Sequence, residues 1–186
     1  MIRCHFGRLA NDLRAPVLIR PHLTLSDCPP QGERMRLSDG MSVERIVDLK
    51  ATSKDEAIAE LIDLAVTASA VDEFSEQLLG RVLEREALTS TAVDRGVAIP
   101  HARSEQVKGV VVSLGIHRSG LDFGSPNGDP VHLVFLVLSA PTATPAYLSI
   151  LGRTARIFRS EQMLQSVLGA TGAEQIVKII AAHEPS

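Results

Sequence analysis

Tryptophan is absent from this chain of 186 residues, and aromatic residues make up only 3% of it. A folded core must therefore be built from aliphatic side chains, and the sequence offers few rings on which the bases of single-stranded nucleic acid stack. The formal net charge of −3 gives no support for a surface that binds duplex nucleic acid. These features favour an ordinary globular protein that does not bind nucleic acid.

Cysteine and long apolar runs are scarce as well. The two cysteines, Cys4 and Cys28, lie near the N-terminus, so the sequence predicts no disulfide framework and a reducing, cytoplasmic compartment. No apolar run approaches the roughly 20 residues that span a membrane, so direct membrane insertion is not expected. The chain also lacks a zinc-protease pair of histidines, a cysteine cluster, a phosphate-binding Gly-rich loop and a Gly-x-Ser-x-Gly turn. We therefore predict no metal and no cofactor.

The first 34 residues contain four prolines and no sustained hydrophobic period. We expect residues 1–34 to be a flexible, disordered extension, followed by one folded domain over residues 35–183. An Arg-rich, acid-poor start is also typical of a transit peptide. A flexible tail, or an upstream start codon ahead of Met35 or Met41, is the interpretation that we favour.

Two helices are predicted before the middle of the chain. Ser53 and Glu56 form a capping-box pattern ahead of apolar residues at helical spacing, which predicts a helix over residues 54–70. A second helix is predicted from Asp72 to Glu86. Arg85 falls in the same angular sector as the apolar residues of this helix. Arg85 therefore either extends outward and complements the helix dipole, or faces an anion at the edge of the core.

The middle of the chain is typical of strands and its last third of helices. Continuous apolar runs predict strands at 97–99, 110–116 and 131–138, covered on both faces, while 43–49 fits either a strand or a short helix. Helices are predicted from Thr144, from Ser160 and after a capping box at Thr171, the first with one face formed by Tyr147, Leu148, Leu151, Ala155 and Phe158. This order predicts a single α/β domain with a central mixed sheet flanked by helices on both faces.

His101 follows Pro100 at the end of the first apolar run, where we expect a strand to end in a loop. A neutral imidazole, with an unperturbed pKa of about 6.5, is a competent nucleophile toward a phosphoryl group. Arg85, Arg103 and the N–H groups of the helix that starts at Thr144 are candidates for compensating the phosphoryl charge. Spacing alone does not show that these groups converge, and a single histidine is more often structural.

Residues 81–101 read Arg-Val-Leu-Glu-Arg-Glu-Ala-Leu-Thr-Ser-Thr-Ala-Val-Asp-Arg-Gly-Val-Ala-Ile-Pro-His. This stretch resembles the signature of the fructose/mannitol-type (type 2) IIA domains of the bacterial phosphotransferase system, which include a nitrogen-regulatory branch. The shared pattern is an Arg-Glu pair, a Ser-Thr pair and a Gly-initiated run that ends in Pro-His. Residues 121–123 and 128–135 match further blocks, and the resemblance extends from residue 36 to about 182.

The resemblance implies a role for each matching residue. His101 matches the phosphorylated histidine of the family, and Arg85 matches the arginine beside the phosphoryl group. Ser90 and Thr91 match the Ser-Thr pair near the site, where they either support the chemistry or only shape the loop. Tyr147 stands where the family often has a second histidine. A phenol donates a hydrogen bond but does not become a cation near neutral pH.

Four other polar residues are expected to be structural. His117 is expected to end a strand and His132 to lie within one. The carboxylates of Asp122 and Asp129 flank a predicted turn, where we expect them to accept hydrogen bonds from backbone N–H groups.

The resemblance implies a phosphoryl carrier that takes phosphate on His101 from a phosphohistidine carrier protein (HPr-like) and passes it to a IIB component in sugar uptake. The alternative is a regulatory protein of the nitrogen-related type, which binds partners according to the phosphorylation state of His101. A third hypothesis, a ligand-binding α/β domain without phosphoryl chemistry, gains only if no donor phosphorylates His101.

Overall fold

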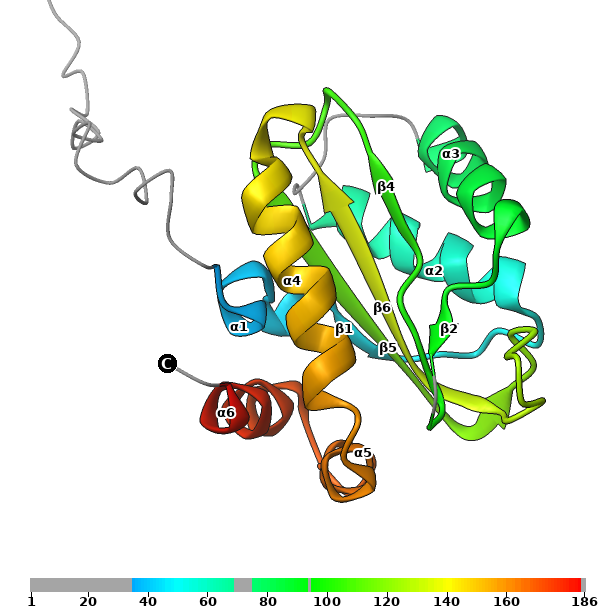
Figure 1. The fold of residues 1–186 in the computed structure, drawn as a ribbon, viewed down its shortest axis with the longest axis vertical. Helices are drawn as coiled ribbons and strands as arrows, with labels where there is room; N and C mark the ends of the chain where they lie inside the picture. Colours follow the sequence, from blue (N-terminus) through cyan, green and yellow to red (C-terminus); the bar gives the residue numbers. More distant parts are fainter. Residues whose placement is uncertain (1–34, 69–74, 94, 185–186) are drawn as a thin grey trace, which may run out of the picture. The chain divides into compact units, whose positions relative to one another are not determined.

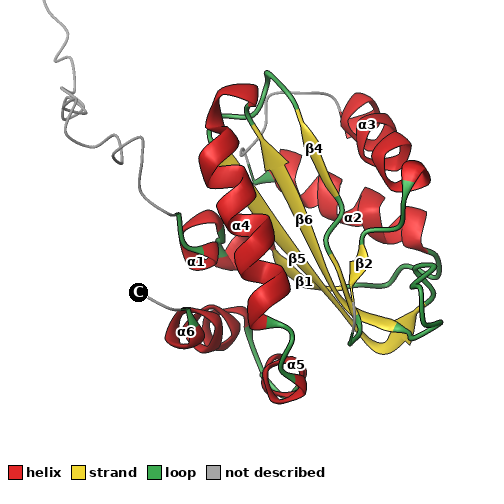
Figure 2. Ribbon diagram, in the orientation of Figure 1, coloured by secondary structure: helices red, strands yellow, loops and turns green. Residues whose placement is uncertain are grey.

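The computed structural model describes residues 35–68, 75–93 and 95–184. The predictions made for residues 1–34, for the last two residues of the helix expected at 54–70 and for the first three of the helix expected at 72–86 lie outside this part of the chain. Within it, one mixed sheet is covered by helices on both faces, as predicted (Figures 1 and 2). None of the helices in the described residues has the length and hydrophobicity to cross a lipid bilayer.

The sheet is built around an antiparallel pair, β5 (Val110–Leu121) and β6 (Val131–Ser139). A short parallel strand, β1 (Ile46–Asp48), pairs with β5. On the other side, β3 (Val97–Ala98) and β4 (His101–Arg103) both run parallel to β6. The outermost strand, β2 (Ala92–Val93), is antiparallel to β3. The region 43–49, which the sequence left undecided, contains both predicted kinds of structure: a 3-10 turn, η2 (Val43–Arg45), followed by β1.

Alternating side chains of β6 pack into two separate hydrophobic layers. Leu136 and Leu138 belong to the layer beneath α2 (Lys54–Thr67) and α3 (Ser75–Leu88). Phe135 and Val137 face the opposite layer, which is formed by α1 (Leu37–Gly40), α4 (Thr144–Ile157), α5 (Glu161–Leu168) and α6 (Ala173–His183). Figure 1 shows α4 crossing one face of the sheet while α2 lies behind the other. The continuous apolar run of β6 is thus explained by burial on both faces.

Three helix starts differ in detail from the predictions. The Ser53 hydroxyl accepts the Glu56 N–H as expected, but the strongest backbone hydrogen bond of the Glu56 carboxylate comes from the Thr52 N–H at 2.7 Å and a weaker one from Ser53. The last helix begins after Gly172. Its predicted box is wrong, because the Thr171 N–H and hydroxyl both donate to the Gln175 side chain. Ser160 and Gly169 flank α5 as predicted, but the Ser160 side chain makes no capping hydrogen bond.

The prediction that Thr144 caps its helix is wrong. A 3-10 turn, η3 (Pro141–Ala143), runs directly into α4, so Thr144 is already helical and its hydroxyl donates back to the Pro141 carbonyl at 3.1 Å. The predicted apolar face is also partly wrong, because Leu148 is 58% exposed. The buried residues of α4 are Tyr147, Ile150, Thr154 and Ile157.

Candidate functional site

His101 begins a short strand instead of lying in a loop, which corrects the prediction from the sequence. Pro100 has no N–H to donate, so the ladder between β3 and β6 is interrupted there. The Pro100 carbonyl still accepts from the Val137 N–H at 2.9 Å, and pairing with β6 resumes at His101. The imidazole is therefore attached to the edge of a rigid sheet and is half-buried.

Two neighbours determine which imidazole nitrogen carries the proton. Nδ1 lies 2.7 Å from the carbonyl oxygen of Ile99, which can only accept a hydrogen bond, so Nδ1 is the donor. Nε2 lies 3.2 Å from Nε of Arg85, which can only donate, so Nε2 is the acceptor. The neutral ring therefore carries its proton on Nδ1 and a lone pair on Nε2.

Arg85 reaches this nitrogen from the last turn of α3. Its Nη1 donates to the Thr89 carbonyl at 3.2 Å while its Nε donates to His101, so the guanidinium is held at two points. Of the two orientations that the sequence left open for Arg85, the structure shows the inward one. The helical phase that placed Arg85 beside apolar residues of α3 was therefore informative.

The ring of Tyr147 packs edge-to-face on the imidazole of His101, with centroids 5.9 Å apart and planes at 68°. The guanidinium of Arg103 lies over the same tyrosine ring, 4.8 Å from its centroid. Burial raises the pKa of the Tyr147 phenol, and the charges of Arg103 and Arg85 partly oppose this. The phenol therefore remains a neutral hydrogen-bond donor at physiological pH.

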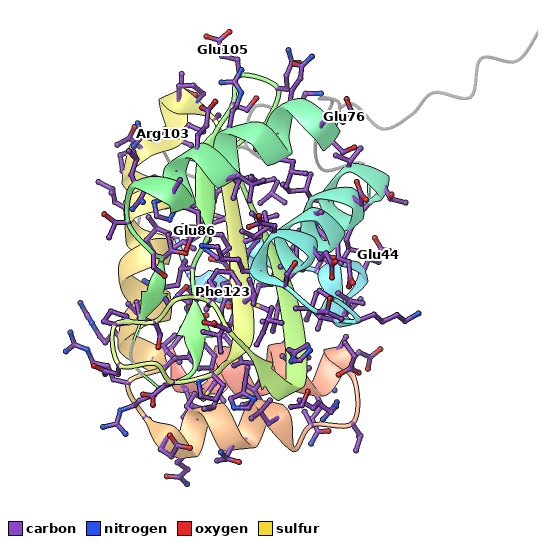
Figure 3. The ribbon with its side chains drawn as sticks, turned by 90° about the vertical axis from the view of Figure 1, so that its right-hand side faces the viewer. Glu44, Glu76, Glu86, Arg103, Glu105 and Phe123 are labelled. Atoms are coloured by element: carbon purple, nitrogen blue, oxygen red, sulfur yellow. The ribbon has the colours of Figure 1, made fainter. Side chains whose placement is uncertain are left out.

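A pocket of about 280 Å³ opens above His101, lined also by Arg81, Glu84, Arg85, Ala102, Arg103 and Tyr147. Three of these side chains are cations and one is an anion, so the lining favours a small anion. Figure 3 shows Arg103, one of these lining residues, at the edge of the molecule. A larger hollow of about 460 Å³ lies at the start of α6, and none of these residues lines it.

The surroundings favour the neutral form of His101. Burial lowers the pKa of this histidine below its ordinary value of 6.5, and the nearby charge of Arg85 acts in the same direction. The hydrogen bond to Ile99 and the charge of Glu86 act against this lowering. At neutral pH the lone pair on Nε2 is therefore available to an electrophile.

Ser90 and Thr91 shape the segment that joins α3 to β2. The Ser90 hydroxyl donates to the Phe123 carbonyl at 3.0 Å, and the Thr91 N–H donates to the carboxylate of Glu86 at 3.0 Å. Glu86 is only 3% exposed, and no role was predicted for it from the sequence. The one signal that could have identified it is its place in the Arg-Glu pair of the family signature.

The other polar residues lie outside the pocket lining. α4 contributes Tyr147 to the lining and not its first N–H groups, so the anion site expected at Thr144 is not formed there.

His132 lies within β6 as predicted, but His117 lies inside β5 instead of ending it. Asp122 accepts from the Gly124 N–H at 2.9 Å, as expected for a turn carboxylate. Asp129 instead uses its backbone carbonyl, which accepts from the Ser125 hydroxyl. In the described residues, no group of three or more His, Cys, Asp and Glu side chains is placed to hold a metal ion.

Comparison with known proteins assigns the chain to a family. Residues 42–183 match the model for "Phosphoenolpyruvate-dependent sugar phosphotransferase system, EIIA 2". A nitrogen regulatory protein of Bradyrhizobium diazoefficiens is 32% identical over 148 residues, which cover 79% of this chain and 95% of that protein. The fructose-specific EIIABC component of Bacillus subtilis is 27% identical over 138 residues, 74% of this chain but only 22% of that protein.

Solved structures agree with the sequence comparisons. The crystal structure of nitrogen regulatory protein IIA-Ntr from Neisseria meningitidis superposes with a TM-score of 0.72 at 27% identity, covering 77% of this chain and 98% of that one. The family match spans nearly all of the described residues, from η2 to the end of α6. The chain therefore belongs to the EIIA type 2 family, whose members are components of the phosphoenolpyruvate-dependent sugar phosphotransferase system.

Proposed function

We propose that this protein is a phosphoryl carrier in which Nε2 of His101 accepts and releases the phosphoryl group. The lone pair of Nε2 attacks the phosphorus of a phosphohistidine on a donor protein. A new N–P bond forms on His101 while the N–P bond of the donor breaks, and the donor imidazole keeps the electron pair. The observation that carries this proposal is the pair of contacts, Nδ1 to the Ile99 carbonyl and Nε2 to Nε of Arg85, which leaves the lone pair of the ring on Nε2 beside a cationic pocket.

The pocket residues have matching roles in this proposal. As the phosphoryl group approaches, the lone pair of Nε2 leaves its hydrogen bond with Arg85, and the guanidinium donates to a phosphoryl oxygen instead. Arg103 adds a second positive charge at the rim, and the Tyr147 hydroxyl is a neutral donor to the same group. Charge compensation and positioning are the main requirements of phosphoryl transfer, because the transition state spreads negative charge over the phosphoryl oxygens.

The proposed donor is an HPr-like phosphohistidine carrier protein, and the proposed acceptor is a IIB component. Membership of the EIIA 2 family supports both partners, and the Bacillus subtilis relative is named an EIIABC component. Incubating the full chain with phosphoenolpyruvate, the general phosphotransferase enzyme and the HPr-like carrier should produce one acid-labile phosphoryl group per chain. His101→Ala should accept none, whereas His183→Ala, which alters an exposed histidine at the end of α6, should accept as much as the wild type. Equal labelling of His101→Ala would refute the proposal.

A second function, regulation of partner proteins, is favoured by the relative that this chain matches almost end to end. That relative is named a nitrogen regulatory protein, and the chain covers 95% of its length. In this case phosphorylation of His101 changes the charge at the pocket mouth from cationic toward neutral, so a partner that contacts the rim distinguishes the two states. Pull-downs with phosphorylated wild type, unphosphorylated wild type and His101→Glu test this function. Identical partners in all three samples would count against a switch.

A further inference from the structure

Glu86 is a buried carboxylate next in sequence to Arg85, on the sheet side of α3 (Figure 3). Both of its oxygens accept the N–H of Thr91, at 3.0 and 3.2 Å. Burying a carboxylate costs free energy unless it is well hydrogen-bonded, and the N–H of one loop residue offsets only part of this cost. The hydrogen bonds that lead from the loop of Thr91 to His101 suggest what this buried carboxylate does.

Two chains of hydrogen bonds run from the segment 89–91 to the two nitrogens of His101. In the first, the Thr89 carbonyl accepts from Arg85, and Arg85 donates to Nε2 of the imidazole. In the second, the Thr91 carbonyl accepts from the Ile99 N–H at 3.1 Å, and the Ile99 carbonyl accepts from Nδ1 of the same ring. Glu86 anchors Thr91, from which the second chain starts. Thr89, from which the first chain starts, is only two residues away.

We propose that Glu86 is a positioning residue for phosphoryl transfer at His101, acting through the segment 89–91 to hold the imidazole in one tautomer and one orientation. This inference rests on the proposed function. Glu86 itself does not line the pocket, so it acts through Arg85 and Ile99 and not by touching the phosphoryl group. Its carboxylate fixes the loop. The loop in turn fixes Arg85, which donates a hydrogen bond to Nε2, and Ile99, whose carbonyl accepts one from Nδ1. Nε2 points into the pocket as a result.

A structural role alone makes different predictions. If Glu86 only stabilised the fold, its replacement would lower the free energy of unfolding and leave the tautomer of the imidazole and the rate of phosphoryl acceptance unchanged. Glu184 offers a matched control. It is also a buried carboxylate, 6% exposed, and it accepts from the N–H groups of Leu37 and Ser38 at the start of α1. Glu184 also accepts from the Ser38 hydroxyl, so replacing it disturbs more hydrogen bonds than replacing Glu86, without touching the two chains that end on His101.

The test compares Glu86→Gln, Glu184→Gln and wild type as full chains, with two measurements on each. The first is the ¹⁵N spectrum of the His101 ring, which reports the tautomer without any partner protein. The second is the rate of phosphoryl acceptance as a function of donor concentration. The glutamine amide keeps one oxygen that can accept the Thr91 N–H, so Glu86→Gln is expected to fold. Should it not fold, Glu86→Asp, which keeps the charge but withdraws it by one methylene, replaces it in the same measurements.

We expect wild type and Glu184→Gln to show a single Nδ1–H tautomer, and Glu86→Gln to show nitrogens averaged between both tautomers. At saturating donor, Glu86→Gln should accept phosphate more slowly by on the order of tenfold, because small misplacements of a reacting atom are costly in rate. The half-saturating donor concentration should not change, since the rim of the pocket is intact. Glu184→Gln should lose thermal stability and nothing else.

The titration of His101 should also change in Glu86→Gln, for an electrostatic reason that is separate from positioning and does not decide between the two roles. The groups that face this ring from the packed elements are, on α3, Arg81, Glu84, Arg85 and Glu86; on β4, Arg103; and on α4, Tyr147. Because the charge of Glu86 raises the pKa of His101, its removal in Glu86→Gln should move the midpoint of the His101 titration to lower pH.

An unchanged tautomer and an unchanged rate in a folded Glu86 variant would overturn the inference and leave Glu86 a structural residue. The two proposals fail separately. If wild type accepts no phosphoryl group from any donor, the proposed function is wrong, yet the ring spectra still decide whether Glu86 positions the imidazole.

Discussion

Nε of Arg85 donates to Nε2 of His101 across 3.2 Å, so the resting site already contains the pair of groups that a bound phosphoryl group needs. The guanidinium keeps the nitrogen unprotonated while the site is empty. In the proposed reaction, it then becomes available to the phosphoryl oxygens once the nitrogen forms its bond. The proposal thus gives one arginine two successive roles.

Removing the Arg85 side chain should slow phosphoryl transfer strongly. We expect Arg85→Ala to reduce the transfer rate on the order of a hundredfold, as loss of a preorganised donor to developing charge does. Arg85→Lys should recover only part of the rate, because an ammonium group lacks the planar fork that bonds Thr89 and His101 together. Arg156→Ala, which removes an exposed arginine near the end of α4, is the control and should transfer normally. Unaltered transfer by Arg85→Ala would show that Arg85 is not part of the reaction.

The reaction should lose rate in acid. Because burial lowers the pKa of His101 below 6.5, the neutral ring predominates at pH 6.5, and protonated rings come to predominate as the pH falls through this lower value. Protonation removes the lone pair on Nε2, so phosphoryl acceptance should decline over the same pH range. An NMR titration of His101 alongside the rate profile checks this, and a midpoint above 6.5 would contradict it.

The same shift affects stability, with a defined sign. Between the folded pKa and 6.5, the unfolded chain binds a proton on His101 that the folded chain does not. The free energy of unfolding of the wild type should therefore rise with pH through this window, and the gain should be complete above 6.5. His101→Gln should lack this contribution, which is measured by urea unfolding at several pH values. A steeper pH dependence in His101→Gln than in wild type would be inconsistent with a lowered pKa.

Tyr147 should stabilise the phosphorylated protein through its hydroxyl. Tyr147→Phe keeps the ring that packs on His101 and under Arg103 but loses the donor, so the phosphoprotein should hydrolyse faster, by about tenfold if the hydrogen bond to the phosphoryl group is made. Tyr147→His provides an imidazole that can become a cation, and its phosphoprotein should last longer than that of Tyr147→Phe. The lifetime of the acid-labile phosphate measures both. Equal lifetimes of wild type and Tyr147→Phe would exclude the hydroxyl.

A side chain at Gly115 in β5 should lower the free energy of unfolding. A Cβ built there would lie 2.6 Å from Cδ1 and 2.7 Å from Cγ of Leu49, which is itself buried. Gly115→Ala should therefore cost about 1–3 kcal/mol of unfolding free energy through overpacking. Gly152→Ala is the control, because a Cβ at this exposed position of α4 meets nothing within 4 Å, and alanine should stabilise the helix by up to about 1 kcal/mol. Equal stability of Gly115→Ala and wild type would contradict the packing.

Much of this fold could be predicted from hydrophobic patterns. The apolar runs of β5 and β6 predicted strands buried on both faces, and the helical spacing after Ser53 predicted α2. The errors arose where one backbone group changed the local geometry. Pro100 interrupts a strand ladder that resumes at the next residue, so His101 lies on a strand. The 3-10 turn before Thr144 places this residue inside the helix, so it is not the cap that was predicted. Leu148, in the same helix, was predicted to be buried and is exposed.

The candidate site was predictable in part. Helical phase placed Arg85 at the edge of the core, and the family signature connected it to His101, although 16 residues separate the two in the chain. Glu86 gained no role from the pattern, because periodicity identifies apolar positions and a buried carboxylate resembles a solvent-exposed one in a sequence. Its contribution depends on where the Thr91 N–H points, which only the folded loop shows.

The most direct test of this account is to locate the phosphorus atom on the imidazole. Phosphorylated, ¹⁵N-labelled protein should show a phosphorus–nitrogen coupling to Nε2 of His101, with Nδ1 still protonated by its bond to Ile99. Coupling to Nδ1, or a phosphoryl group on any other residue, would contradict the mechanism at its central step.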